Sequence, residues 1–237
     1  MASEQENLPI PGLEDSKRTN EPQVIVVEQN ILRENEEIAR QVRRLLAEKQ
    51  IYACNLVSSP GSGKTSLLLE TLQALKGKIR CAVIEGDQQT SNDARRIAQT
   101  GVPVVQVNTL QSCHMNADQV LRSLEQLPLD GIQLLFIENV GNLICPASMD
   151  LGENEKVVLM SITEGEDKPA KYPLVFHQAR VLLLTKMDLL PHLRFDLDLC
   201  GQYVRQVNPS IQIIQTSVYN RQGLDDWLAY LERQIRD

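Results

Sequence analysis

Residues 54–72 read CNLVSSPGSGKTSLLLETL, an apolar run followed by a Gly-rich turn and then by leucines at helical spacing. Within it, segment 58–65 (SSPGSGKT) nearly matches the phosphate-binding pattern G-x-x-x-x-G-K-[ST], with Ser58 in place of the first glycine. In such a strand–turn–helix unit, backbone N–H groups of the turn and of the helix N-terminus surround phosphate oxygens. This stretch therefore predicts a nucleotide-binding α/β domain, and it indicates binding more strongly than hydrolysis.

The side chains of this turn have separate expected roles. Lys64 should reach the terminal phosphates as a catalytic group, and the Thr65 hydroxyl should bind Mg²⁺. The predicted nucleotide-binding residues of the turn are Ser59, Pro60, Gly61, Ser62, Gly63, Lys64, Thr65 and Ser66.

The rest of the chain alternates short apolar runs with helical patterns. Several of the runs are apolar without alternation, which is typical of strands covered on both faces. This order predicts an α/β fold, a doubly wound and mostly parallel sheet of the P-loop GTPase type with its ligand at the carboxyl ends of the strands. Strands are predicted at 52–57, 81–85, 104–107, 134–138, 157–162, 181–185 and 211–216, and helices at 31–49, 65–75, 93–99, 114–124, 195–207 and 224–235.

The N-terminal residues differ from the rest in composition. Residues 1–23 are mostly polar and contain Pro9, Pro11, Gly12 and Pro22, so we expect a flexible arm ahead of a domain at 24–237. An amphipathic helix should open that domain, because apolar residues recur at helical spacing from Ile31.

Charge and cysteine content exclude several classes of protein. The net charge is -7, from 24 Lys+Arg against 31 Asp+Glu, and without a basic run a nucleic-acid partner is not expected. No segment approaches ~18 consecutive apolar residues and no secretory pattern opens the chain, so we expect a cytoplasmic protein without membrane contact. The five cysteines stand singly, which favours thiols over a disulfide framework.

A second short motif concerns the base of the nucleotide. Residues 185–188 read TKMD at the end of a predicted strand, which is similar to the guanine motif N/T-K-x-D. Asp188 would accept two N–H bonds from guanine, and adenine would leave it unpaired at a cost of about 1–3 kcal/mol. The stem of Lys186 would lie on the base, and Thr216 and Ser217 follow the last predicted strand like a base-contacting loop. We therefore expect GTP as the nucleotide.

Two predicted strands end in carboxylates near the phosphate turn, in VIEGD at 83–87 and LLFIEN at 134–139. We expect Asp87 and Glu138 to be catalytic, holding Mg²⁺ directly or through water and orienting the attacking water. Asp93 suits a helix cap as well as it suits catalysis. Gly141, three residues after Glu138, suits a loop that senses the γ-phosphate. No glutamine clearly occupies the water-positioning place, so slow intrinsic hydrolysis of GTP to GDP and phosphate is expected.

A group of soft ligands lies outside these motifs. Cys113 directly precedes His114, and Cys145 precedes Pro146. Thiolate and imidazole suit Zn²⁺ or Ni²⁺, but these are three ligands where a closed zinc site has four. Adjacent helical residues point about 100° apart, so this pair can share a metal only at an irregular helix start or across a two-fold axis. A dimer-interface site is the natural solution, and ordinary buried cysteines with a satisfied histidine remain the alternative.

Six segments together resemble the nickel-incorporation GTPases of hydrogenase maturation, the HypB family: SSPGSGKT (58–65), EGDQQTSNDARRI (85–97), SCHMNADQV (112–120), LFIENVGNLICPA (135–147), SITEGEDKPAKYP (161–173) and TKMDLLP (185–191). The resemblance extends from about Val24 to the C-terminus, and Ser58 matches that family's own phosphate loop. It implies a homodimeric GTPase that binds Ni²⁺ or Zn²⁺ through Cys113, His114 and Cys145. It further implies delivery of nickel to the [NiFe]-hydrogenase large subunit, together with a HypA-type accessory protein.

One departure from that family limits the expectation. Some members carry an N-terminal C-x-x-C-G-C nickel site or a His-rich storage tract, and the N-terminal arm here has neither Cys nor His. A second tight nickel site and a storage role are therefore not expected. Nucleotide state should bias dimerisation and metal affinity, because the loops after Asp87 and Glu138 lead into the metal-ligand segments.

Three alternatives remain at this point. A urease-type nickel GTPase typically uses Cys-Pro-His, whereas Ala147 follows Pro146 here. A small-molecule kinase would need an acceptor-binding lid, which is not visible. A metal could also merely staple a nucleotide-dependent dimer without delivering nickel. In EGEDKP, Lys168 either contacts the nucleotide or the other protomer, or belongs to a solvated loop.

Overall fold

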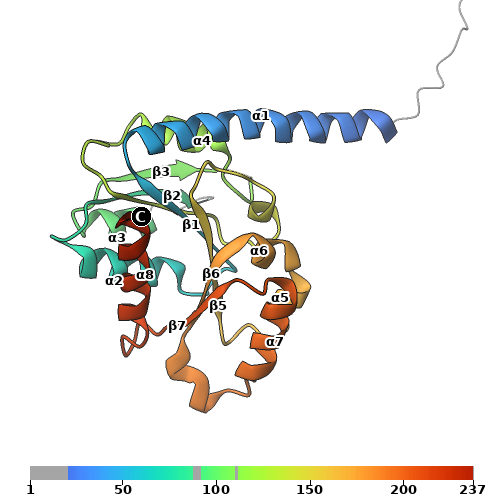
Figure 1. The fold of residues 1–237 in the computed structure, drawn as a ribbon, viewed down its shortest axis with the longest axis vertical. Coiled ribbons are helices and arrows are strands. Elements are labelled where there is room, and N and C mark those ends of the chain that lie inside the picture. Colours follow the sequence, from blue (N-terminus) through green and yellow to red (C-terminus); the bar gives the residue numbers. More distant parts are fainter. Residues whose placement is uncertain (1–20, 88–91, 110–111, 237) are drawn as a thin grey trace, which may run out of the picture.

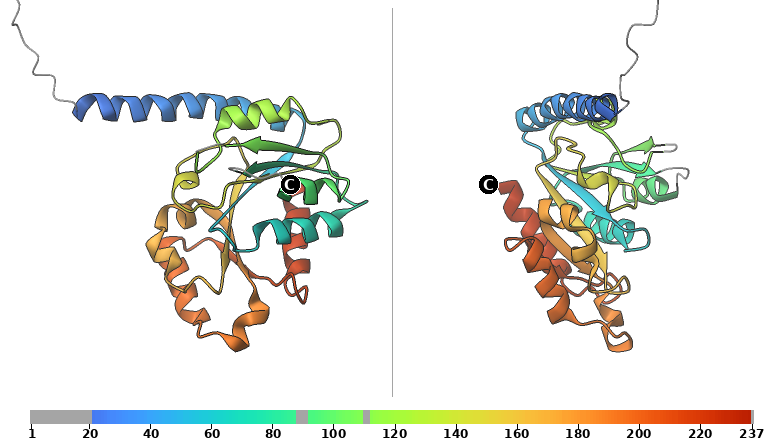
Figure 2. Two further views of the ribbon diagram at one scale, coloured as in Figure 1. Left: turned by 180° about the vertical axis from the view of Figure 1, so that it is seen from behind. Right: turned by 90° about the vertical axis from the view of Figure 1, so that its right-hand side faces the viewer.

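The computed structural model describes residues 21–87, 92–109 and 112–236. Its centre is a seven-stranded, all-parallel sheet in the order β3-β2-β4-β1-β5-β6-β7, with helices on both faces (Figures 1 and 2). The predicted doubly wound sheet is confirmed, and each predicted strand is present. The strands are β1 Tyr52–Ser58, β2 Cys81–Asp87, β3 Val104–Asn108, β4 Leu134–Glu138, β5 Glu155–Ser161, β6 Ala179–Thr185 and β7 Gln212–Gln215.

The helices divide between the two faces according to the two-residue period of the strands. Cys54 and Leu56 of β1 face a core shared with α2, α3 and α8. On the opposite face of the sheet, Ala53 packs in a cluster with α1 and α4, and Val57 packs in a cluster with α6 and α7. Both faces are apolar, which explains the continuous apolar runs in the sequence. The helices are α1 Glu21–Glu48, α2 Lys64–Leu75, α3 Asn92–Ala98, α4 Ala117–Leu124, α5 Lys168–Lys171, α6 Pro173–Gln178, α7 Leu197–Val207 and α8 Leu224–Arg236, with 3₁₀ turns η1 Cys145–Ala147 and η2 Met187–His192.

Helix α1 is longer than the sequence pattern indicated. It begins at Glu21 rather than at Ile31, and Figure 1 shows its first part extending beyond the sheet. Pro22 lies in the first turn, where a missing N–H costs no helical hydrogen bond. The apolar period marks only the docked part, in which Ala39, Val42 and Leu46 are fully buried or nearly so. The predicted arm falls mainly on residues 1–20, outside the described residues.

The short elements α5, α6, η1 and η2 were not predicted. Each is too short for a helical period to be visible in the sequence, and prolines stand in all of them. Across the described ranges, the structure contains no helix that is both long and apolar enough to span a bilayer.

The strand order of the sheet reverses at the central strand β1. It pairs with β4 on one side and with β5 on the other. Ligands of such sheets bind at this reversal of strand order, beyond the carboxyl ends of the strands. The turn after β1 therefore lies beside the ends of β2, β4 and β6.

The loop before β5 should be sensitive to any added side chain. Gly152 and Gly77 both have a left-handed φ, +84° and +78°, which costs another residue roughly 1–2 kcal/mol. A Cβ at Gly152 would lie 2.6 Å from Val42 and 2.7 Å from the Ala39 carbonyl of α1, whereas one at Gly77 meets nothing within 4 Å. In urea denaturation, Gly152→Ala should lower the free energy of unfolding by about 1–3 kcal/mol more than Gly77→Ala. Equal losses in the free energy of unfolding would show that α1 shifts to accommodate the added Cβ without cost.

Candidate functional site

The turn after β1 adopts the conformation that phosphate binding requires. Gly61 and Gly63 have φ of +75° and +94°, in the left-handed region that glycine enters at no steric cost. Gly63 immediately precedes α2, so the N–H groups of the turn and of the first helical residues are available to an anion. A cleft of about 570 Å³ opens over them and is lined by Ser58, Ser59, Pro60, Gly61, Ser62, Gly63, Lys64, Thr65, Ser66, Glu85, Gly86, Asp87, Asp93, Arg96, Glu138, Val140, Gly141 and Lys186.

Acidic side chains from two strands and one helix converge on the start of α2. The Thr65 hydroxyl lies 2.6 Å from Glu138 Oε1 and 3.1 Å from Asp93 Oδ2. Lys64 Nζ lies 3.2 Å from the same Glu138 oxygen, and both side chains of this ion pair are largely buried. Asp87 lines the same cleft from the end of β2. Hydroxyl and carboxylate oxygens in this number suit Mg²⁺.

One oxygen of Glu138 supports that fit. Its Oε2 is buried without a hydrogen-bond partner among the described residues, and an unpaired buried oxygen of this kind is costly. A hard cation beside Thr65 would satisfy it. The structure also gives Asp93 a dual position, since it faces Thr65 on one side and pairs with Arg96 at 3.1 Å on the other.

Glu85 is a site residue that the sequence analysis missed. It lies two residues before Asp87 on β2 and lines the cleft with only 3% of its surface exposed. Burial, and then the neighbouring carboxylates beginning with Glu138, raise the pKa of Glu85 to about 8, although Lys64 acts in the opposite direction. Its Oε2 has no hydrogen-bond partner in the described part of the chain. The pattern VIEGD alone did not reveal which of its two acids is buried.

The predicted base-binding residues are brought together at the end of β6. The Thr185 hydroxyl donates to the Ser62 carbonyl at 2.6 Å, and Lys186, at φ +61°, donates to the Gly61 carbonyl at 2.7 Å. Asp188 accepts a hydrogen bond from the Ser217 hydroxyl, which comes from the loop after β7. The Met187 N–H donates to the Thr216 carbonyl in the same loop. The TKMD segment is thus tied both to the phosphate turn and to the last loop.

The three soft ligands also meet within one chain. One ligand atom each of Cys113, His114 and Cys145 lies within 4.8 Å of the other two, and all three residues are partly exposed. The predicted helix start at His114 is wrong, because α4 begins at Ala117. Asn116 caps it in a reciprocal pair with Gln119. The cysteine–histidine pair therefore lies in an irregular loop, and no two-fold axis is needed to bring the ligands together.

The protonation of this cluster suits a soft metal. The hydrogen bond with the Cys145 thiol is the main factor that raises the pKa of Cys113, and burial lowers the pKa of His114. A neutral imidazole can bind a metal directly, whereas the Cys113 thiol has to release its proton before its sulfur becomes a ligand. The remaining cysteines, Cys54, Cys81 and Cys200, are buried as expected for core residues.

Lys168 does not line the cleft. Its ammonium lies 3.6 Å from Glu164 and 5.1 Å from the centre of the Tyr172 ring, at the start of α5. Within the single chain, these contacts account for its position.

The phosphate turn, the acidic strand ends and the TKMD loop on this parallel sheet define a P-loop nucleotide-binding protein of the GTPase fold. Residues 52–215 match the family model described as "CobW/HypB/UreG, nucleotide-binding domain". The chain belongs to this family, because the match covers more than half of its length.

Individual relatives extend this result. The chain is 53% identical over 225 residues to "Hydrogenase maturation factor HypB" of Azotobacter chroococcum mcd 1, which covers 94% of this chain and 72% of the relative. The structure is similar to that of HypB from Helicobacter pylori in complex with nickel, with a TM-score of 0.82, 33% identity and coverage of 86% of this chain and 95% of that one. For the hydrogenase maturation factor HypB from Archaeoglobus fulgidus, the TM-score is 0.80 at 31% identity, with 85% and 98% covered.

Glu85 should make the stability of the protein depend on pH. With a pKa of about 8 in the fold and roughly 4.3 in the unfolded chain, its carboxyl stays protonated in the native state after the unfolded chain has lost the proton. Raising the pH between these values therefore lowers the free energy of unfolding. Urea denaturation of metal- and nucleotide-free protein should show this fall, and Glu85→Gln, which is neutral throughout, should flatten it. Parallel curves for the two proteins would contradict the assignment.

Proposed function

We propose that this protein is a GTP-hydrolysing metallochaperone that supplies nickel during maturation of [NiFe]-hydrogenase. The observation that carries the proposal is the convergence of Cys113, His114 and Cys145 in one chain, beside a nucleotide cleft. The kinship with HypB proteins, including the relative whose structure holds nickel, supports the same conclusion.

The nucleotide is held by the chain's own donors and acceptors. Backbone N–H groups between Gly61 and Thr65 bind the phosphates, and Lys64 neutralises charge on the terminal ones. Asp188 accepts the N–H groups of guanine, with Lys186 beside the base and Thr216 and Ser217 closing the loop. Bound Mg²⁺ would neutralise phosphate charge, held by Thr65 with Asp87 and Glu138 as its acidic partners. In this proposal, the same two carboxylates orient a water for attack on the γ-phosphate. The slow intrinsic hydrolysis predicted from the sequence is part of this proposal.

The metal cluster suits cargo rather than a permanent structural ion. Three N and S ligands leave the coordination of Ni²⁺ or Zn²⁺ open, whereas structural zinc sites are closed by four protein ligands. All three side chains are partly exposed, so a recipient can reach the ion. An open, exposed site is what transfer of nickel to another protein requires.

One loop connects the two sites. It begins at Glu138, which contacts Lys64 and Thr65, and ends at Cys145 in η1. Between them, Val140 and Gly141 line the nucleotide cleft, and Asn142 donates to the Cys113 carbonyl at 3.3 Å. A γ-phosphate that moves this loop would therefore change the geometry of the ligands.

The partners follow from this role. We propose a homodimer, with a HypA-type nickel or zinc accessory protein and the hydrogenase large subunit as the further partners, acting in the cytoplasm, where the free thiols stay reduced. The side chain of Ile144, directly before Cys145, is 66% exposed, which favours a protein contact beside the metal ligands.

Asp188→Asn should change the base that is bound. The amide N–H of asparagine would face the C2 amino group of guanine, so that two donors meet. Xanthine has a carbonyl at C2, which can accept that N–H. GTP affinity should fall about 10–100-fold and xanthosine triphosphate should become the better ligand. Competition against a fluorescent guanine nucleotide measures both, with ATP as the control that stays weak. Unchanged affinity for GTP would mean that the base lies elsewhere.

Cys145→Ala should weaken Ni²⁺ binding at least tenfold, because it removes a direct ligand. Cys200→Ala, in the core, is the matched control and should bind Ni²⁺ like the wild type.

The proposed coupling between nucleotide state and Ni²⁺ affinity is measured by chelator competition with GDP or a non-hydrolysable GTP analogue present. Mass measurement on the same samples follows dimer formation. Equal affinity and stoichiometry in the two nucleotide states would contradict the switching role. Loss of hydrogenase activity in a Cys145→Ala strain whose dimer is intact would exclude the alternative in which the metal only holds the dimer together.

A further inference from the structure

A chain of buried polar side chains runs through the core between β1 and β5. Asn55 is fully buried, and Glu153 and Lys156 are only 8% and 9% exposed. Asn55 and Lys156 are direct partners in the β1–β5 register. Because burial of a charge without partners is strongly unfavourable, every contact of Lys156 is informative.

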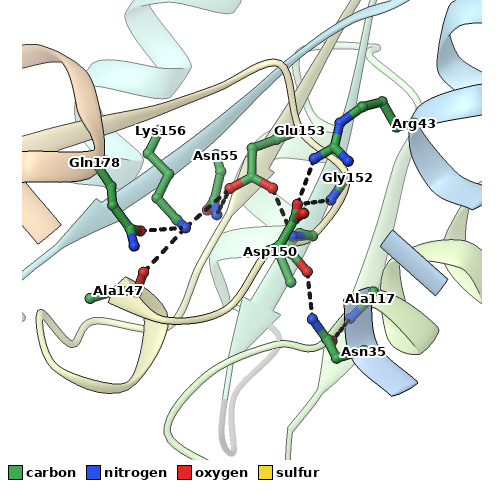
Figure 3. A network of polar contacts seen from close by, with 11 residues as sticks. Asn35, Arg43, Asn55, Ala117, Ala147, Asp150, Gly152, Glu153, Lys156 and Gln178 are labelled. Carbon is green, nitrogen blue, oxygen red and sulfur yellow. Dashed lines mark hydrogen bonds and ion pairs between the residues drawn. The ribbon is translucent and has the colours of Figure 1, made fainter. Parts of the chain in front are cut away.

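Lys156 links three segments (Figure 3). Its ammonium donates to the Ala147 carbonyl at 3.3 Å and to Gln178 Oε1 at 3.0 Å, and it lies 3.6 Å from Glu153 Oε1. Ala147 ends η1, the turn that begins with Cys145. The other oxygen of the Glu153 carboxylate accepts a hydrogen bond from the Leu151 N–H. Leu151 belongs to the segment that leads from η1 to β5. The position of the Cys145 turn thus depends on a buried ion pair.

The other end of the chain reaches the cysteine–histidine loop. Asn55 donates to Glu153 Oε1 at 3.0 Å and accepts from Asn139 Nδ2 at 3.3 Å. Asn139, also fully buried, accepts the Met115 N–H with its side-chain oxygen at 3.3 Å. Met115 directly follows His114. Both ends therefore reach backbone groups of the two segments that carry the metal ligands.

We propose that Asn139, Asn55, Glu153 and Lys156 are positioning residues that set the spacing between the Cys113–His114 loop and the Cys145 turn. This inference rests on the proposed metal-binding function. Apolar side chains at these positions would also hold β1 and β5 together, and often give a more stable core. Their packing, however, is not directional in the way that hydrogen bonds are. Met115 and Ala147 also pack in the core, and the hydrogen bonds of the chain add a defined direction at the Ala147 carbonyl and at the Met115 N–H. Since bonds from a metal such as Zn²⁺ to N and S are only about 2.0–2.3 Å long, small displacements of either segment change the distances between metal and ligands.

The test measures Ni²⁺ affinity of the full chain, without nucleotide, by chelator competition. Lys156→Met keeps the length of the side chain and removes its charge and donors. It should weaken Ni²⁺ binding roughly tenfold, as the loss of outer-shell support does, and change the sulfur-to-nickel absorption. GDP affinity, measured on the same samples, should stay unchanged. A parallel loss of GDP affinity would overturn the proposal in favour of a general loosening of the fold.

Two controls separate position from stability. Gln178→Ala removes one partner of the same ammonium and leaves its hydrogen bond to the Ala147 carbonyl, and Glu155→Gln alters a buried acid of β5 that contacts Cys54 and Tyr230. Both should bind Ni²⁺ like the wild type. If they weaken binding as much as Lys156→Met does, the effect is not positional and the proposal is wrong.

Cys145→Ala distinguishes the two levels of failure. Normal Ni²⁺ binding by Lys156→Met, together with weak binding by Cys145→Ala, overturns the positioning role and leaves the metal site standing. Normal binding by Cys145→Ala overturns the proposed function itself. Should Lys156→Met not fold, Glu153→Gln provides the same comparison, because it removes the charge opposite Lys156 but keeps an oxygen for Asn55. Wild-type Ni²⁺ affinity in that variant overturns the positioning role.

Discussion

The left-handed turn at Gly61 and Gly63 is the constraint on which the site depends. It turns backbone N–H groups toward one point at the carboxyl end of β1. The loop after β6 is anchored on its carbonyls, through Thr185 on Ser62 and Lys186 on Gly61. The loop after β4 packs directly against it, since a Cβ at Gly141 would lie 3.1 Å from the Pro60 Cα. The phosphate turn is therefore the common support of the base pocket and of the loop that leads to Cys145.

Buried charge is the second theme of the structure. Glu85, Glu138, Glu153 and Lys156 are each less than a tenth exposed, and apolar residues at these positions would generally give a more stable core. Two of them line the cleft over the phosphate turn, and two contact the backbone at Ala147 and Leu151, on either side of the loop before β5. In both places, the charged groups contact a segment next to a candidate site. Stability is given up where geometry is needed, as is common at binding sites.

The sequence was sufficient for most of the fold, and it named the candidate residues of each site, whose roles stay predictions. The strands were predictable because both faces of the sheet are covered, and the phosphate turn because its glycines and Lys64 stand at fixed spacing. The first part of α1 was not, because it lies outside the amphipathic period. The start of α4 was misplaced because an Asn116–Gln119 cap outweighs the apolar pattern that includes His114.

Residue types and spacings along the chain thus determined the sheet and the nucleotide motifs and marked Cys113, His114 and Cys145 as candidate soft ligands, since these depend on local pattern. Only the tertiary structure decided that Cys113, His114 and Cys145 meet within one protomer, that Glu85 rather than Asp87 is the buried acid of β2, and that Lys156 supports η1. These facts depend on which strands are neighbours and on which side chains lose water. Contacts between residues far apart in sequence set both, and the order of the sequence does not contain them.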